Sequence, residues 1–386
     1  MEFLREILIN IIGNLLSAVI LLLIGTVIWL CASNLQTRTI LAKRDPQVIK
    51  DKTLSKAVEQ GHPIRAKYRV ETSFRRVLSD WEIDFLVEYY NFTTGRDAYD
   101  GRCLRLDGYE VSGGEILLTL SPVGFFDLIT TNLSFFPGNI RTVGPWKRIA
   151  SWTMLPKYYA ILSERRHQIL GHLDPKDPNL FEKTIANRKL ANALAISVNI
   201  LDFQGNTLVV RRPRSITVAA DTYSVAVTGT LTEADLFGET GSVLTRGAAR
   251  ETLEEFGLPV DPAAIRPVDI IMTPQKFQPT ALLEVQVATD LKSIATQAQR
   301  GKDFVAEAAA LYVLNLRDPA EFFSVTRRLP FSPASVYALD RAFARVNSLD
   351  DSEFLCLKKQ YRPSPALATR WEKHPVFSVE PQDNLK

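Results

Sequence analysis

The stretch GAARETLEEFGLP, residues Gly247–Pro259, carries most of the information about the fold. On a helix, Glu251, Glu254 and Glu255 lie three and four residues apart, so their carboxylates share one face. Like charges at this spacing destabilise a helix by about 0.2–0.5 kcal/mol per pair, and a divalent cation would neutralise them. Carboxylate oxygens suit Mg²⁺ or Mn²⁺, and these ions bind phosphates. The pattern predicts a metal-binding helix that ends at Gly257; the alternative is a solvated acidic helix face.

Residues 250–258, RETLEEFGL, resemble the second half of the Nudix box, G-x5-E-x7-R-E-U-x-E-E-x-G-U, where U is aliphatic. The resemblance implies that Glu254 and Glu255 hold Mg²⁺ or Mn²⁺. It implies that Glu251 assists them and that Arg250 braces the preceding loop. If the protein is an enzyme, these three glutamates are its catalytic residues.

The resemblance covers residues 187–346 and implies an α/β/α sandwich around a mixed sheet. Members of this superfamily typically cleave a nucleoside diphosphate linked to another group. The residue pattern and the turn signals predict five strands and a closing helix in this range. The strands are Ala195–Phe203, Thr207–Pro213, Ser224–Leu231, Pro267–Thr273 and Ala281–Val287, and the helix is Ser332–Val346.

The first half of the box departs from the family pattern. Counting back from the box arginine, the family's glycine and glutamate fall on Leu236 and Ser242, and Thr252 replaces an aliphatic residue. Gly229 is a better candidate for the first glycine, which would leave residues 230–245 as an expanded loop. The loop that wraps a pyrophosphate in the family is therefore altered here. We expect this change to affect hydrolysis more than binding.

Further candidate ligands are basic residues near the end of the second predicted strand. Arg211, Arg212 and Arg214 could contact phosphates, and a solvated strand end is an equally good interpretation. Glu307 is a weaker candidate for an additional metal ligand, because the family often places a carboxylate late in the domain.

The N-terminal region predicts a membrane anchor. No charged residue occurs between Ile7 and Thr37. About 24 apolar residues in a helix span roughly 36 Å, enough to cross a bilayer core of about 30 Å. Basic residues are concentrated after this segment, so the positive-inside rule places the N-terminus outside and the C-terminal bulk in the cytoplasm. We expect a single-pass protein, with residues 1–37 as the anchor.

Small and polar residues fall on one face of the predicted anchor. Asn10, Asn14 and Ser17 follow a helical spacing, and Gly13 with Ser17 forms a small-xxx-small pair. Such residues permit close helix approach in lipid. This face has two interpretations. One is self-association of the anchors, and the other is an ordinary anchor that tolerates a few polar residues.

The remaining segments are less informative. Residues 38–63 are polar and predict a juxtamembrane linker or helix, residues 64–182 a small α+β module without a catalytic constellation, and residues 347–386 an irregular tail. The formal net charge is only +3, which argues against a protein that coats DNA or RNA polymers. The three cysteines form no CxxC or Cys/His cluster, so a zinc site is not expected.

The domain order resembles the transmembrane-Nudix effectors associated with CD-NTases in bacterial CBASS antiphage systems. This resemblance implies that the Nudix-like domain binds a cyclic dinucleotide. The anchors would then form a homo-oligomer that disrupts the lipid bilayer of the inner membrane. The second hypothesis is a membrane-tethered pyrophosphohydrolase acting on nucleoside diphosphate derivatives. A third is a membrane adaptor that uses residues 64–182 for protein contacts.

Overall fold

The computed structural model describes residues 48–94, 97–134, 153–171, 173–174, 177–213, 221–298 and 308–378, together with Ser17, Gly301 and Phe304. The chain divides into two compact units, Met1–Lys43 and Arg44–Lys386. The second unit is described below.

The predicted anchor lies almost wholly outside the described residues. Ser17 is its one described position, and it is helical and exposed. Asn10, Gly13 and Asn14 are outside the described part. Among the described helices, none combines the length and the apolar character that crossing a bilayer requires. The membrane segment therefore stays a prediction.

A mixed sheet of eight strands forms the larger part of the second unit. Its main path runs β11-β10-β5-β4-β9-β8, with β6 paired to β5 and β7 paired to β4. Strands β4 and β9 are parallel, and the other pairs are antiparallel. This confirms the predicted mixed sheet. The strands are β4 (Ala195–Asp202), β5 (Asn206–Arg211), β6 (Tyr223–Val225), β7 (Val227–Thr230), β8 (Ile265–Ile271), β9 (Thr280–Val287), β10 (Ala310–Asn315) and β11 (Phe377–Ser378).

Side chains alternate between two apolar cores along β4, β5, β8, β9 and β10. In β4, Ile196, Val198 and Ile200 enter one core and Leu201 enters the other. In β9, Leu282 lies in the opposite core from its neighbours. A strand that is buried on both faces needs cover on both sides of the sheet.

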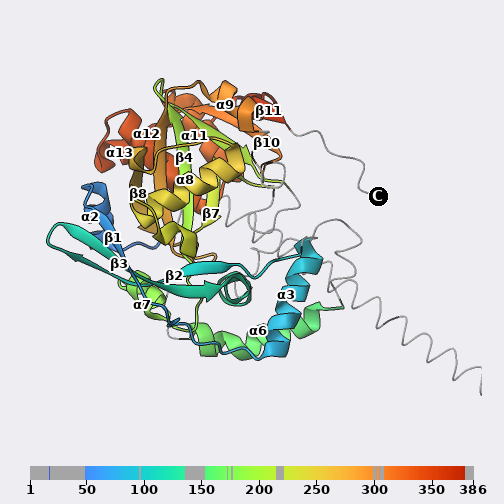
Figure 1. Ribbon diagram of the computed structural model, residues 1–386. Coiled ribbons are helices and arrows are strands. Elements are labelled where there is room, and N and C mark those ends of the chain that lie inside the picture. Colours follow the sequence, from blue (N-terminus) through green and yellow to red (C-terminus); the bar gives the residue numbers. More distant parts are fainter. Residues whose placement is uncertain are drawn as a thin grey trace, which may run out of the picture. The chain divides into compact units, whose positions relative to one another are not determined.

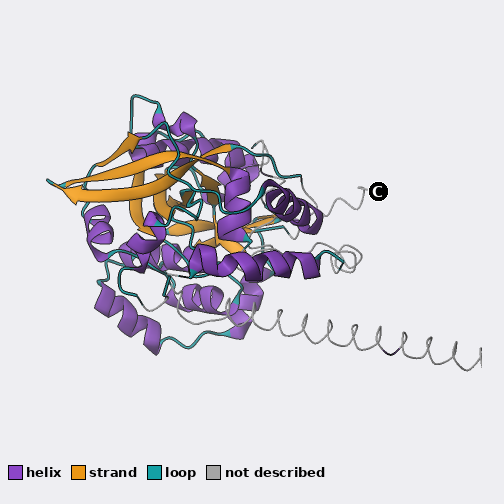
Figure 2. Ribbon diagram, turned by 90° about the horizontal axis from the view of Figure 1, so that it is seen from below, coloured by secondary structure: helices purple, strands orange, loops and turns teal. Residues whose placement is uncertain are grey.

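Helices supply that cover. Helices α8 and α9 contribute to the first core, and α11 to α14 contribute to the second. Figure 1 shows α8 lying across β4 and β7, and Figure 2 shows helices on both sides of the strands. The helices and short 3-10 turns of this part are η2 (Glu233–Leu236), α8 (Val243–Phe256), η3 (Pro262–Ala264), α9 (Leu291–Gln297), α11 (Pro319–Arg328), α12 (Pro333–Val346), α13 (Asp351–Gln360) and α14 (Pro365–Glu372).

A smaller sheet of three strands precedes the larger one, in the order β1-β3-β2. Its β2 joins the larger part through backbone hydrogen bonds from Leu104 N to Leu231 O and from Leu194 N to Leu104 O, both 2.8 Å. Leu104, Leu106 and Leu118 belong to the same core as Ile196. The elements of this part are α2 (Lys52–Glu59), β1 (Ile64–Tyr68), α3 (Asp80–Thr94), β2 (Arg102–Ser112), β3 (Glu115–Gly124), α4 (Phe125–Leu128), η1 (Ile129–Leu133), α6 (Leu155–Leu170) and α7 (Leu180–Ala186).

The described end of the predicted linker is packed against the larger sheet. Ile49 exchanges two backbone hydrogen bonds of 2.8 Å with Met272, just after β8. Ser55 on α2 donates to the buried Asp269 at 2.7 Å. Tyr337 on α12 donates to the other oxygen of that carboxylate at 2.8 Å.

The expectation of an irregular tail was wrong for the described residues up to Ser378, which contain α13, α14 and β11. Asp350 caps α13 and forms a capping box with Glu353. The prolines do not break these helices, because Pro365 stands in the first turn of α14, where no backbone N–H is needed. Trp371 on α14 stacks on Tyr312, with ring centroids 4.5 Å apart. Burial of this aromatic side chain ties the tail to the core.

Candidate functional site

The helix that carries the box glutamates, α8, begins at Val243, seven residues before Arg250. Ser242 caps it by accepting a hydrogen bond from the amide of Thr245 at 3.3 Å. Gly257 ends it in the left-handed conformation, with φ +59°, and its amide donates to Leu253 O at 2.9 Å. The predicted end at Gly257 is confirmed, since glycine adopts a positive φ without steric cost.

Arg250 organises the polar side chains around this helix. Its Nη1 donates to Glu251 at 2.9 Å and to Glu254 at 3.0 Å. Its Nη2 donates to the carbonyl of Thr230 at 3.1 Å. Two further bonds, from Nε and Nη2, reach the carboxylate of Asp235 at 2.9 and 3.0 Å. Arg250 therefore braces the preceding loop while it bridges two glutamates, because its planar fork carries five donors.

Asp235 is a residue that the sequence analysis missed. It stands six residues after Gly229, which is the spacing of glycine and glutamate in the G-x5-E half of the box. Residues 236–249 separate it from Arg250, twice the seven-residue spacing of the pattern. Seven additional residues amount to about two helical turns, so they can lengthen α8 without rotating its glutamates to another face. The Gly229–Asp235 spacing was the signal that could have identified it.

The two positions obtained by counting back from the box arginine have other roles. Leu236 contributes its carbonyl, which accepts from Arg246 Nη2 at 3.1 Å, and Ser242 caps α8. Arg246 also donates to the carbonyls of Asp235 at 2.8 Å and of Gly241 at 2.7 Å. The expanded loop is thus folded around one arginine side chain.

The side chain of Glu251 packs on Gly229. A Cβ atom at position 229 would lie 2.1 Å from Cδ of Glu251, so a larger residue there would displace this side chain. Burial raises the pKa of Glu251 to about 7, against the opposing effect of the Arg250 charge. The carboxyl group can therefore exchange a proton near neutral pH.

The other two glutamates face different surroundings. Glu255 is 6% exposed, and its Oε1 accepts from the amide of Thr228 at 3.2 Å. The side chain of Glu254 is 39% exposed and contacts Arg250. Carboxylates are suitable ligands for a divalent ion. Here, however, Arg250 joins Glu251 and Glu254, and Glu255 faces β7. In the described part of the chain, no group of three or more His, Cys, Asp or Glu side chains is placed to hold a metal ion.

The predicted phosphate ligands separate into different environments. Arg211 pairs with Asp221 at 3.1 Å. Arg212 Nη1 donates to the hydroxyl of Thr228 at 2.7 Å, so Thr228 contacts both this arginine and Glu255. Arg214 and Glu307 lie outside the described residues.

Lys276, in the loop between β8 and β9, is a second residue that the sequence analysis missed. Burial and the nearby charge of Arg212 lower the pKa of Lys276 to about 8. Its backbone carbonyl accepts from Asn132 at 3.2 Å. The loop lies at the start of β4, because Ala195 pairs with Thr280 in β9. Arg212 contacts Thr228, and Lys276 lies near enough to Arg212 for the two charges to interact.

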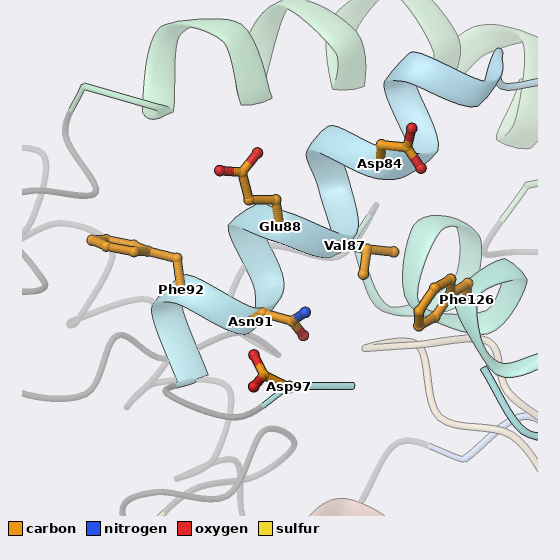
Figure 3. A pocket seen from close by; sticks show the side chains of 7 residues that line it. All are labelled: Asp84, Val87, Glu88, Asn91, Phe92, Asp97 and Phe126. Atoms are coloured by element: carbon orange, nitrogen blue, oxygen red, sulfur yellow. The ribbon is translucent and has the colours of Figure 1, made fainter. Parts of the chain in front are cut away.

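A pocket of about 540 Å³ lies elsewhere, beside α3. Figure 3 shows that α3 supplies most of its lining. Its acidic side chains are exposed, and it shares no residue with the polar network around α8. The lining residues are Asp84, Val87, Glu88, Asn91, Phe92, Asp97 and Phe126.

Comparison with known proteins found similarity in solved structures alone. No family model matches the chain. No curated protein matches it. A Deinococcus radiodurans protein is 16% identical, with 44% of this chain and 83% of that chain covered and a TM-score of 0.24. A MutT/nudix family protein from Enterococcus faecalis is 14% identical, with 44% and 81% covered and a TM-score of 0.22. TM-scores of this size do not establish a shared fold.

Proposed function

We propose that residues 187–346 form a Nudix-type domain that binds the phosphates of a nucleotide and hydrolyses a nucleoside diphosphate derivative. One observation carries the proposal: Arg250 joins Asp235 to Glu251 and Glu254 across the expanded loop. In this proposal the box residues stay connected despite the seven additional residues, and Gly229 and Asp235 form the first half of the box.

The side chains of this region suit such a reaction. Glu251, whose pKa lies near 7, would accept a proton from an attacking water molecule. Arg212 and Lys276 would offset the negative charge of the bound phosphates. Mg²⁺ or Mn²⁺, held by Glu254 and Glu255, would polarise a phosphate oxygen. Glu254 is the most exposed of the three glutamates, so it can leave Arg250 to become a ligand.

The experiment compares the full chain with a Glu254→Gln, Glu255→Gln double variant, using Mg²⁺ and a panel of nucleoside diphosphate derivatives. We expect the wild type to release a phosphate-containing product and the double variant to lose turnover by at least a hundredfold. Glu239→Gln is the matched control, because Glu239 is an exposed carboxylate in the same loop. Absence of cleavage across the panel would refute the hydrolase proposal.

The second candidate function is a membrane effector that senses a cyclic dinucleotide in antiviral defence of the CBASS type. The uncharged segment at residues 7–37 and the seven additional residues before Arg250 favour it. A cyclic dinucleotide contains phosphodiesters and no pyrophosphate, so it would be bound without cleavage. Ligand binding would favour the assembled state to the extent that the ligand binds this state more tightly.

In that proposal, the predicted anchors associate in the bacterial inner membrane through Asn10, Gly13, Asn14 and Ser17. The test is dye release from liposomes that contain the full chain, with and without a panel of cyclic dinucleotides. Release that depends on an uncleaved ligand, and that Gly13→Leu abolishes, would support the effector. Pyrophosphate cleavage without dye release would favour the hydrolase.

A further inference from the structure

The smaller sheet contacts the box loop through a side chain that the proposed reaction does not use. Tyr68, at the end of β1, donates its hydroxyl to Oε1 of Glu233 at 2.7 Å. Arg102, at the start of β2, lies 3.5 Å from the other oxygen of this carboxylate. Glu233 is the first residue of η2, within the half of the box that contains Asp235. Two strands of the smaller sheet therefore meet one residue of the loop.

Backbone contacts bring β2 to the same place. Cys103 forms an isolated antiparallel bridge with Thr232. Burial and the nearby Asp100 raise the pKa of the Cys103 thiol to about 12, while Arg250 acts in the opposite direction.

A short series of hydrogen bonds continues from Glu233 to the box glutamates. The amide of Thr232 donates to the carboxylate of Asp235 at 2.8 Å, which closes the turn that starts with Glu233. The same carboxylate accepts two bonds from Arg250, which in turn contacts Glu251 and Glu254. The position of this turn therefore sets where Arg250 and its glutamates can lie.

We propose that Glu233 is a positioning residue of the Nudix-type site and that Tyr68 of the smaller sheet holds it in place. The smaller sheet then belongs to the functional unit and is not a separate module for binding other proteins. The expected change in kcat rests on the proposed function. The expected change in hydrogen exchange does not, because it is measured without any substrate.

The two partners of Glu233 contribute unequally. The side chain of Arg102 is 79% exposed, and an ion pair at such a site contributes little because solvent screens it. Tyr68 is partly buried, and its hydrogen bond to the Glu233 carboxylate is the shorter contact. We therefore expect Tyr68→Phe to have a larger effect than Arg102→Gln.

The experiment uses the full chain with Tyr68→Phe, Glu233→Gln and the double variant. The matched control is Tyr109→Phe, which removes a similar hydrogen bond of 3.2 Å between β2 and Glu182 on α7, away from the box loop. Loss of one hydrogen bond to a charged group should lower kcat roughly three- to tenfold in Tyr68→Phe, with KM changed less. The double variant should be no worse than the stronger single variant, because both substitutions act on the same contact.

Hydrogen exchange of the amides in residues 231–236 separates this inference from the proposed function. We expect exchange there to be faster in Tyr68→Phe than in the wild type, and unchanged in Tyr109→Phe. If the wild type cleaves no substrate but this difference is present, the hydrolase proposal fails and the positioning role stands. Equal exchange in Tyr68→Phe and Tyr109→Phe would overturn the positioning role, whatever the activity.

Discussion

Arg250 and Asp235 form a two-pronged ion pair, with Nε–Oδ1 and Nη2–Oδ2 distances of 2.9 and 3.0 Å. The aspartate is 3% exposed and follows Gly229 by the spacing of the family's first two box residues. The pair joins the two ends of the segment 236–249, which comprises a loop and the first two turns of α8. Through Arg250, this contact connects the loop before α8 to Glu251 and Glu254.

Replacement of Asp235 by Asn should destabilise the protein by roughly 3 kcal/mol, because it leaves the Arg250 guanidinium without its main counter-charge. The measurement is urea unfolding of the purified full chain, with a lower midpoint and an unchanged slope. Asp261→Asn is the control, since Asp261 is an exposed N-cap of η3 and Asn caps equally well. Equal effects of the two substitutions would contradict the role of the ion pair.

Replacement of Glu251 by Gln should stabilise the protein at pH 8 and have little effect near pH 4. The folded pKa of about 7 exceeds the unfolded value of 4.5, so the native state holds more protons between these values. Stability is therefore lost as the pH rises through this window, by at most roughly 3 kcal/mol. Thermal unfolding from pH 4 to pH 8 measures the difference, with Glu239→Gln as the exposed control. If Glu251→Gln raised the Tm by the same amount at pH 4 and at pH 8, this explanation would be refuted.

Replacement of Lys276 by Met should weaken binding of ADP roughly tenfold at pH 7, because one cation of the proposed phosphate site is removed. The pKa of Lys276 is lowered to about 8, so the wild type should lose affinity as the pH rises above that value. The variant should show no such decline. Isothermal titration calorimetry from pH 7 to pH 9 measures both effects. The exposed Lys292 supplies the control Lys292→Met, which should retain the wild-type profile.

Replacement of Trp371 by Ala should cost about 3–5 kcal/mol of unfolding free energy, as expected for a large aromatic side chain in a core. Trp371 is 9% exposed, stacks on Tyr312 and donates to the carbonyl of Val313 at 2.8 Å. Urea unfolding is again the measurement. Leu355→Ala, at a half-exposed position of α13, should change stability by less than about 0.5 kcal/mol. A small effect of the Trp371 substitution would mean that the tail does not stabilise the core.

Much of the fold could be predicted because it depends on neighbouring residues. The alternation of apolar and polar residues located β4, β5, β8 and β9, and Gly257 located the end of α8. The contact between Arg250 and Glu254 followed from their separation by four residues on one helix. Such relationships are set by helix and strand geometry, which is the same in every protein.

Other features depend on residues that are distant in sequence or on loops without a periodic pattern. The sequence analysis did not predict the helices of the proline-containing tail, although Asp350 and Glu353 form a capping box at the start of α13. The packing of Trp371 on Tyr312 of β10 joins residues that are distant in sequence. The three glutamates looked equivalent on a helical face, yet Glu251 packs on Gly229, Glu255 faces Thr228 and Glu254 is half-exposed. Each glutamate has a different environment because other elements of the fold cover it to a different extent. The spacing of residues along the helix does not show this.

The sequence by itself determined which residues line the carboxylate face of α8 and where that helix ends, since both follow from local spacing. The tertiary structure alone decided that Asp235 meets Arg250, that Lys276 lies near Arg212, and that Tyr68 of the smaller sheet holds Glu233. These pairs join segments whose approach depends on the folding of whole sheets around shared cores. The order of residue types along the chain does not show which of these distant segments come together.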